Sequence, residues 1–252
     1  MTGPTAGRWL RRFHPAAPGA PRLVCLPYAG GSASYFFPVS AALAPAAEVV
    51  AVQYPGRQDR RTEPALTDLG ALADHVTTAL RAEPPAPTVL FGHSMGAVVG
   101  YEVARRLDRA GTPARHLVVS GRRPPDGPRP GEDLHTRDDA ALLAELTALG
   151  GPGTDLLADP DLRALAMPAI RGDHQAVETY AYEPGPPLRC PVTVLLGDRD
   201  PKTPLAEAAG WADHTTGPVD QHVFPGDHFF LGHHLDAVLT TLRTALRLRL
   251  VA

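Results

Sequence analysis

The segment that most constrains the fold is TVLFGHSMGAVV at residues 88–99. An apolar run typical of a buried strand leads into Gly-x-Ser-x-Gly, and small residues typical of a packed helix follow directly. Where a strand turns sharply into a helix, side chains two residues before and after the serine would collide, and Gly92 and Gly96 remove both clashes. The segment therefore predicts a strand–turn–helix unit that holds the Ser94 hydroxyl beyond the strand.

The rest of the chain alternates between strand-like and helix-like segments in the same way. Between strands, residues 66–81 and 97–109 place apolar side chains on one helical face. Strand, helix and strand in series require crossover connections, which put helices on both faces of a mostly parallel, doubly wound sheet. Short β-branched or apolar runs predict the strands at 22–26, 48–53, 88–91, 116–120, 192–196 and 222–224.

One connection is far longer than the others. About 70 residues separate the strands ending at Ser120 and starting at Val192, against a usual 2–6. Helical patterns within it and Pro/Gly-rich segments at both ends predict a helical lid over the carboxyl edge of the sheet. A surface subdomain without a role in the site is the alternative. We expect residues 1–120 and 188–252 to form the α/β core and residues 121–187 to form the lid.

Ser94 has the position of a catalytic nucleophile. A hydroxyl is nearly inert at neutral pH unless a neighbouring base takes its proton, and that base needs a carboxylate to orient it. Attack on a carbonyl would create an oxyanion at the N-terminus of the helix, where the Met95 N–H and the helix dipole point. The alternative is a tight turn without chemistry, which the flanking strand and helix disfavour.

A carboxylate and an imidazole follow in the chain order Ser, Asp, His of one known class of triad. Asp200 lies just past the strand at 192–196, and His228 lies just past the strand at 222–224. Asp198 competes with Asp200, but it is still within the turn, where we expect it to fix the backbone. We expect the other histidines to be structural, His93 packing beneath the turn, and we expect no metal site because no ligand set accompanies His228.

The second oxyanion donor is expected from the loop after the first long strand. This loop, PYAGGS at residues 27–32, has small residues that let the backbone approach a substrate, and we select the Ala29 N–H. A glycine turn leading into a helix is the alternative. An apolar substrate pocket is expected to include some of four side chains, although core packing is the common fate of such residues: Phe36, Phe37, Met167 and Phe229.

Three arginines near the sheet edge, Arg57, Arg60 and Arg61, have two interpretations. They could meet a phosphate or the acidic face of a partner protein. Alternatively, they belong to a solvated loop and pair with Asp59 and Glu63. The sequence does not decide between these roles.

Composition excludes several other classes of protein. With 252 residues and a formal net charge of -3, the chain lacks the positive charge that non-specific nucleic-acid binding needs. Cys25 and Cys190 lie in apolar contexts without metal-ligand spacing, so we expect neither a disulfide framework nor a metal. No apolar run reaches the roughly 20 residues that span a bilayer, and arginines interrupt the N-terminal stretch, so we expect a cytoplasmic protein. A monomer is the default expectation.

With these residues in hand, the sequence resembles the type II (external, editing) thioesterases of polyketide and non-ribosomal peptide assembly lines, within the α/β-hydrolase superfamily. The combination of PYAGG with YPGR, and of PAIRGD with GDRDP, is more specific than GHSMG alone. At Tyr28 the family often has histidine, which leaves a backbone role of Ala29 intact. The resemblance covers nearly the whole chain through LVCLPYAGGSASYFFPVSAALA, AVQYPGRQDRR, LFGHSMGAVVGYEVARRL, LVVSGRRPP, MPAIRGDHQAVETY, CPVTVLLGDRDP and FPGDHFFL.

The resemblance implies an α/β-hydrolase fold with a mobile lid, and hydrolysis of acyl groups from the phosphopantetheine thiol of acyl- or peptidyl-carrier proteins. It carries over a triad of Ser94, Asp200 and His228, with Met95 and Ala29 as oxyanion donors. No cofactor is expected. Two alternatives remain open: a generic hydrolase of small oxygen esters, and a non-catalytic protein with a hydrolase fold that only binds a ligand.

Overall fold

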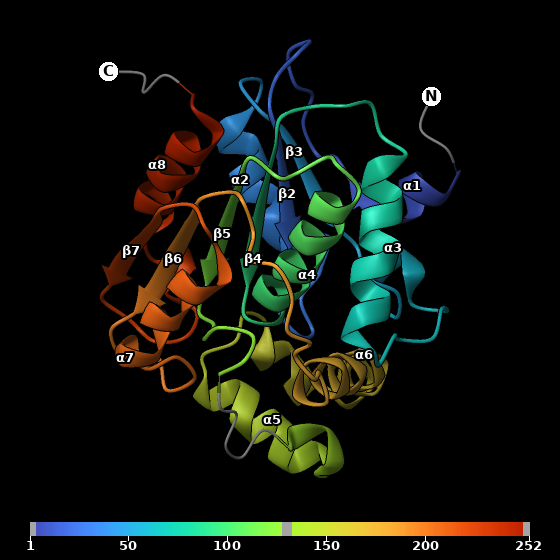
Figure 1. The fold of residues 1–252 in the computed structure, drawn as a ribbon. Coiled ribbons are helices and arrows are strands. Elements are labelled where there is room, and N and C mark those ends of the chain that lie inside the picture. The colour runs from blue at the N-terminus through green and yellow to red at the C-terminus, as the bar shows by residue number, and fades with distance from the viewer. Residues whose placement is uncertain (1–3, 128–132, 249–252) are drawn as a thin grey trace.

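The computed structural model describes residues 4–127 and 133–248, and it places one seven-stranded sheet at the centre of the molecule (Figure 1). The strand order is β1-β3-β2-β4-β5-β6-β7, in which only the edge strand β1 pairs antiparallel. The strands are β1 (Leu10–Arg11), β2 (Arg22–Leu26), β3 (Glu48–Val52), β4 (Thr88–His93), β5 (His116–Ser120), β6 (Val192–Gly197) and β7 (Val219–Phe224).

Helices cover both faces of this sheet. The α-helices are α1 (Pro4–Trp9), α2 (Phe37–Leu43), α3 (Leu69–Arg81), α4 (Met95–Arg109), α5 (Asp139–Ala148), α6 (Pro160–Glu178), α7 (Leu205–Ala208) and α8 (Leu235–Leu246). Short 3-10 helices complete the connections: η1 (Ala33–Phe36), η2 (Gln58–Arg60), η3 (Leu134–Thr136), η4 (Thr154–Ala158), η5 (Ala209–His214) and η6 (Phe230–Gly232).

The alternation of side chains along the strands builds a core on each face. On β2, Val24 and Leu26 face a core that includes buried residues of α3 and α4. Leu23 and Cys25 point the other way, into a core with α2 and α8. The mostly parallel α/β fold predicted from the sequence is therefore confirmed.

All six predicted strands are present, with two informative differences. β7 begins at Val219, three residues before the predicted start, because it is an edge strand whose middle residues are exposed and polar and give no apolar run. The other edge strand, β1, was not predicted, since two residues carry no periodic signal.

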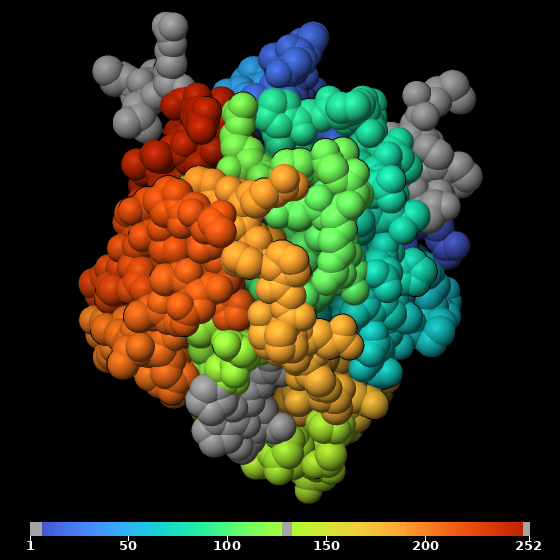
Figure 2. Space-filling model, in the orientation of Figure 1, coloured from blue at the N-terminus to red at the C-terminus, as the bar shows by residue number. Residues whose placement is uncertain are grey.

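The segment predicted as a lid lies at one end of the sheet, where α5 and α6 are drawn at the bottom of Figure 1 and α5 forms a protrusion in Figure 2. Leu142, Met167 and Ile170 belong to a small apolar cluster separate from the two main cores. Further along α6, Ala176 and Val177 join the core that also contains α4. The segment therefore has its own apolar centre and is attached to the sheet domain through the end of α6.

We expect Gly92→Ala to lower the free energy of unfolding by about 3 kcal/mol or more. A Cβ atom on Gly92 would lie 2.0 Å from the Gly96 carbonyl oxygen, a contact that requires β4 and α4 to move apart. Gly232→Ala is the control, because a Cβ there meets nothing within 4 Å, and its effect should stay within about 0.5 kcal/mol. Chemical denaturation measures both, and equal effects would contradict the packing argument.

Candidate active site

Ser94 lies in a strained turn between β4 and α4, as the sequence predicts. Its backbone has φ 54° and ψ −119°, a conformation that side-chain-bearing residues rarely adopt. Gly96 is required on the other side of the turn, because a Cβ there would lie 2.1 Å from the Leu26 carbonyl oxygen of β2. The Ser94 N–H donates to the Ser120 carbonyl oxygen at the end of β5, at 2.8 Å, which anchors the turn to the sheet.

Asp200 and His228 form a buried hydrogen bond across the carboxyl ends of β6 and β7. The Nδ1 atom of His228 lies 2.9 Å from Oδ2 of Asp200, and both side chains are almost fully enclosed. The other carboxylate oxygen of Asp200 accepts a hydrogen bond from the Lys202 N–H at 2.8 Å. These contacts orient the imidazole so that Nε2 is the ring nitrogen left for chemistry.

Asp198 has a different role. Its side chain is 41% exposed, and its Oδ1 accepts a hydrogen bond from the Gly226 N–H at 2.8 Å. It therefore holds the backbone of the loop that carries His228, and the described structure shows no hydrogen bond between Asp198 and the His228 ring. Asp227, which precedes His228, is also exposed and lies near Arg199.

Ser94 and His228 line one cavity of about 50 Å³. Among the described residues, no hydrogen bond joins the Ser94 hydroxyl to the His228 ring; in structures without substrate such catalytic contacts are often long and tighten later. The described residues that line the cavity are Ala29, Ser94, Arg122, Leu134, Leu149, His174, Val177, Glu178, Lys202 and His228.

Two backbone N–H groups next to the strand ends have no hydrogen-bond acceptor among the described residues. Met95 is the first residue of α4, so its N–H has no acceptor within the helix. Ala29 lines the cavity from the loop after β2, and its N–H makes no hydrogen bond within the described part of the chain. Both N–H groups are therefore candidates for the oxyanion donors, and they belong to two different strand ends.

His93 is buried directly beside His228, with ring centroids 5.0 Å apart. Burial lowers the pKa of His93 well below its usual value, and the neighbouring His228 lowers it further. A ring nitrogen of His93, Nδ1, lies 3.0 Å from the Ser120 hydroxyl. As expected from the sequence, His93 packs beneath the turn, where it is neutral and adds no positive charge next to His228.

Much of the cavity wall comes from residues 121–187, the predicted lid, but the wall residues differ from Met167, which the sequence analysis selected from this segment for the pocket. On α6, His174 and Glu178 are joined by a 3.0 Å hydrogen bond, and Glu178 also accepts from His135 at 2.7 Å. Burial opposes ionisation of Glu178, but the hydrogen bonds from His174 and His135 lower its pKa to about 2. The only sequence signal for these residues was the segment MPAIRGDHQAVETY, which contains His174 and Glu178.

A second ion pair links this segment to the triad loop. Lys202, which follows Asp200 and lines the cavity, pairs with Glu145 of α5. Helix α5 is therefore held to the loop whose backbone N–H donates to the Asp200 carboxylate.

None of the four expected pocket residues is among the described residues that line the cavity. Phe36 is buried in the core with α2 and α8, and Phe37 is 49% exposed and packs against Phe13. Met167 belongs to the separate cluster of residues 134–170. Phe229 lies nearer, with its ring 5.1 Å from that of His228 and 4.8 Å from that of Tyr28.

Arg57, Arg60 and Arg61, the three arginines near the sheet edge, lie in different environments. Arg60 is buried, stacks over Trp9 and pairs with Glu63, which agrees in part with the second interpretation. Arg61 is exposed. Arg57 follows neither interpretation, because it is buried against Asp173 of α6.

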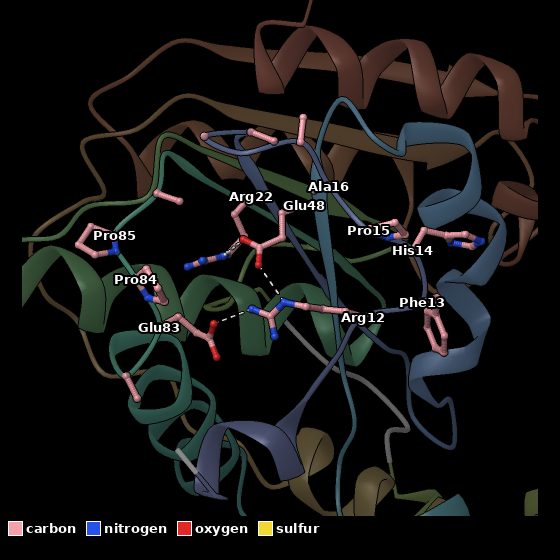
Figure 3. A pocket seen from close by; sticks show the side chains of 15 residues that line it. Arg12, Phe13, His14, Pro15, Ala16, Arg22, Glu48, Glu83, Pro84 and Pro85 are labelled. Atoms are coloured by element: carbon pink, nitrogen blue, oxygen red, sulfur yellow. Dashed lines mark hydrogen bonds and ion pairs between the residues drawn. The ribbon is translucent and has the colours of Figure 1, made fainter. Parts of the chain in front are cut away.

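A larger hollow, of about 930 Å³, lies at the opposite end of the sheet, where β2 and β3 begin. Figure 3 shows the Arg12 guanidinium between Glu48 and Glu83, with Arg22 also bound to Glu48. These charges pair with one another. None of the predicted triad residues is among the described residues that line the hollow, so the smaller cavity is the candidate site.

Over residues 4–127 and 133–248, no group of three or more His, Cys, Asp or Glu side chains is arranged to hold a metal ion. Both cysteines are free and buried, and burial raises the pKa of the Cys190 thiol to about 12. Within the same described ranges, no helix combines the length and the apolar character needed to cross a bilayer.

Comparisons with known proteins agree on one family. The profile described as "Thioesterase domain" matches residues 21–246. The "Probable cadicidin biosynthesis thioesterase" of Streptomyces griseus is 53% identical over 242 residues, which cover 96% of this chain and 67% of that protein. "Thioesterase PikA5" of Streptomyces venezuelae is 50% identical over 230 residues, which cover 90% of this chain and 81% of that protein. The solved structure of the type II thioesterase BorB from the borrelidin biosynthetic cluster is similar with TM-score 0.87 and 48% identity, covering 95% of this chain and 97% of that one.

We expect a fluorophosphonate probe to label the wild-type protein on Ser94 and not to label Ser94→Ala. Asp200→Asn should slow labelling by on the order of 10³–10⁴-fold, because an amide neither holds the correct imidazole tautomer nor stabilises its charged form. Asp198→Asn keeps an oxygen acceptor for the Gly226 N–H and should stay within about tenfold of wild type. Equal losses in the two Asp variants, measured by mass spectrometry over time, would contradict the assignment of Asp200.

Proposed function

This chain belongs to the thioesterase family and is a thioester hydrolase, and from this premise we propose that Ser94, His228 and Asp200 form its catalytic triad and that its substrates are acyl groups on phosphopantetheine arms of carrier proteins. The observation that carries the triad is the buried hydrogen bond between Asp200 and His228, whose ring lines the same cavity as the strained Ser94. It supports nucleophilic catalysis because each group has the partner that its role requires.

In the first half of the reaction, Nε2 of His228 takes the Ser94 proton while Oγ bonds to the thioester carbonyl carbon. The carbonyl π electrons move to oxygen, and the N–H groups of Met95 and Ala29 stabilise that charge by about 3–4 kcal/mol each. When the tetrahedral intermediate collapses, the C–S bond breaks and the sulfur leaves with its electron pair and the proton from His228. A thiolate is a good leaving group, so this step demands little acid catalysis.

In the second half, His228 takes a proton from a water molecule, whose oxygen bonds to the acyl carbon of the acyl-serine. The same two N–H groups stabilise the second oxyanion. Collapse then breaks the bond to Oγ, which regains its proton from His228 and restores Ser94. The products are a carboxylic acid and the free thiol of the carrier arm.

We also propose that residues 121–187 act as a lid. A cavity of about 50 Å³ holds only a few water molecules, whereas pockets for organic ligands occupy roughly 300–1,000 Å³. An acyl-phosphopantetheine chain therefore requires part of the cavity wall to shift. The Lys202–Glu145 pair between α5 and the triad loop is one contact that opening would break.

The biological setting is part of the proposal. Relatives named for cadicidin and borrelidin biosynthesis support a role in clearing stalled or mis-primed carriers during polyketide or non-ribosomal peptide synthesis. We propose that this activity takes place in the cytoplasm. Acyl- and peptidyl-carrier proteins would be the partners.

The proposal predicts that the wild-type enzyme releases acyl groups from loaded carrier protein with kcat/KM at least about tenfold above that for a matched oxygen ester. Intact-protein mass spectrometry follows loss of the acyl mass from the carrier, with Ser94→Ala as the inactive control. A large preference for the free ester would favour a generic small-ester hydrolase. A folded protein that releases neither and is not labelled on Ser94 would instead be a binding protein.

A further inference from the structure

The loop that carries Ala29 is held by a buried ion pair from outside the triad. Arg57 follows β3, and Asp173 lies on α6, in the last quarter of the inserted segment 121–187. Asp173 is 0% exposed and Arg57 is 8% exposed. The two residues are 116 positions apart in sequence, yet both contact the loop at Gly30–Gly31.

The pair has the geometry of a strong, directional contact. Nη1 and Nη2 of Arg57 donate to the two oxygens of Asp173 at 2.6 and 2.7 Å, which is the bidentate arrangement. The guanidinium also lies 5.4 Å from the centroid of the buried Tyr54 ring. Charged groups enclosed in this way keep a fixed orientation, because any displacement leaves a buried charge without its partner.

Both members of the pair also bind the loop backbone. Oδ2 of Asp173 accepts a hydrogen bond from the Gly30 N–H at 2.7 Å, and Nη1 of Arg57 donates to the Gly31 carbonyl oxygen at 3.0 Å. The Gly30 N–H is therefore not free to bind an oxyanion. The N–H of the preceding residue, Ala29, is the one that remains without an acceptor in the described structure.

The same helix that supplies Asp173 touches the loop through side-chain packing. A Cβ on Gly30 would lie 2.8 Å from Cγ1 of Ile170, so α6 packs closely against the backbone at this point. One residue after Asp173, His174 lines the candidate cavity together with Ala29. Helix α6 therefore forms part of the cavity wall. It also holds in place the loop that carries the Ala29 N–H.

We propose that Arg57 and Asp173 are positioning residues for thioester hydrolysis, which hold the Gly30–Gly31 backbone so that the Ala29 N–H stays directed at the oxyanion. The inference rests on the proposed function, since it assigns Ala29 to the oxyanion. Neither residue exchanges a proton or bonds to the substrate. Their contribution is the prior alignment of one hydrogen-bond donor, which acts only when negative charge develops on the carbonyl oxygen.

A positioning role predicts a specific kinetic pattern on a small acyl thioester, hexanoyl-N-acetylcysteamine. Asp173→Asn should lower kcat by about 10²-fold, the size expected when one oxyanion donor is lost, and should leave KM within about threefold. Hexylboronic acid, which forms a tetrahedral adduct with a catalytic serine, should bind more weakly by the same factor. Arg57→Lys keeps the charge but not the bidentate contact, and we expect about a tenfold loss in kcat.

Glu63→Gln is the matched control. It removes the charged partner of Arg60, a buried arginine in the same chain segment, and in the described structure neither residue hydrogen-bonds to Gly30 or Gly31. The kcat of Glu63→Gln should stay within about twofold of the wild-type value. Thermal unfolding of each variant identifies any that do not fold, and Arg57→Lys provides the test if Asp173→Asn is one of them.

A kcat within about twofold of wild type in the folded variants, an effect confined to KM, or an unchanged affinity for the boronic acid would overturn the inference. The two proposals fail in different ways. If the wild-type enzyme hydrolyses the small thioester but not loaded carrier protein, the proposed substrate is wrong while the variants still test the ion pair. If it hydrolyses neither, the boronic acid affinities of the variants decide the inference.

Discussion

Parallel pairing of β2, β4, β5, β6 and β7 is the constraint on which the site depends. Parallel strands end at the same edge of a sheet, so the loops that follow them are neighbours whatever their separation in sequence. Four of these loops each contribute one residue to the candidate site: Ala29 after β2, Ser94 after β4, Asp200 after β6 and His228 after β7. The close approach of α4 to β2 and β4, possible only with glycine at 92 and 96, completes this arrangement.

The inserted segment, residues 121–187, encloses the carboxyl edge of the sheet. Without residues 121–187 the strand ends would form an open surface, whereas His174, Val177 and Glu178 enclose it as a small cavity. The insertion is not an independent cover, because the buried Arg57–Asp173 pair and the packing of Ala176 tie α6 to the sheet domain. The portion around α5 is attached differently, by a Lys202–Glu145 ion pair with partly exposed side chains. Exposed ion pairs contribute little to stability, so this contact of α5 with the triad loop is weaker than the apolar packing of Leu142 against Met167 and Ile170 of α6.

The sequence predicted those features that follow from local chemistry. The Gly-Ser-Gly spacing led to the strained turn, and the distance of Asp200 from its strand distinguished it from Asp198, which the structure places on the loop backbone. Apolar side chains were harder to assign, because a phenylalanine fits a core and a pocket equally well by composition. Phe36 lies in the core, and Phe37 packs on the surface against Phe13. The short strand β1 and the exposed start of β7 lacked the periodic pattern that identifies a strand.

By itself, the sequence determined the alternation of strands and helices, the turn at Ser94 and the order of the three triad candidates, because each is encoded within a few consecutive residues. Only the tertiary structure decided that Arg57 binds Asp173 and not a solvated partner, and that His174 and Glu178 line the cavity. These contacts join residues far apart in the chain. Their partners depend on how α6 packs against the loops after β2 and β3, and no local pattern specifies that packing.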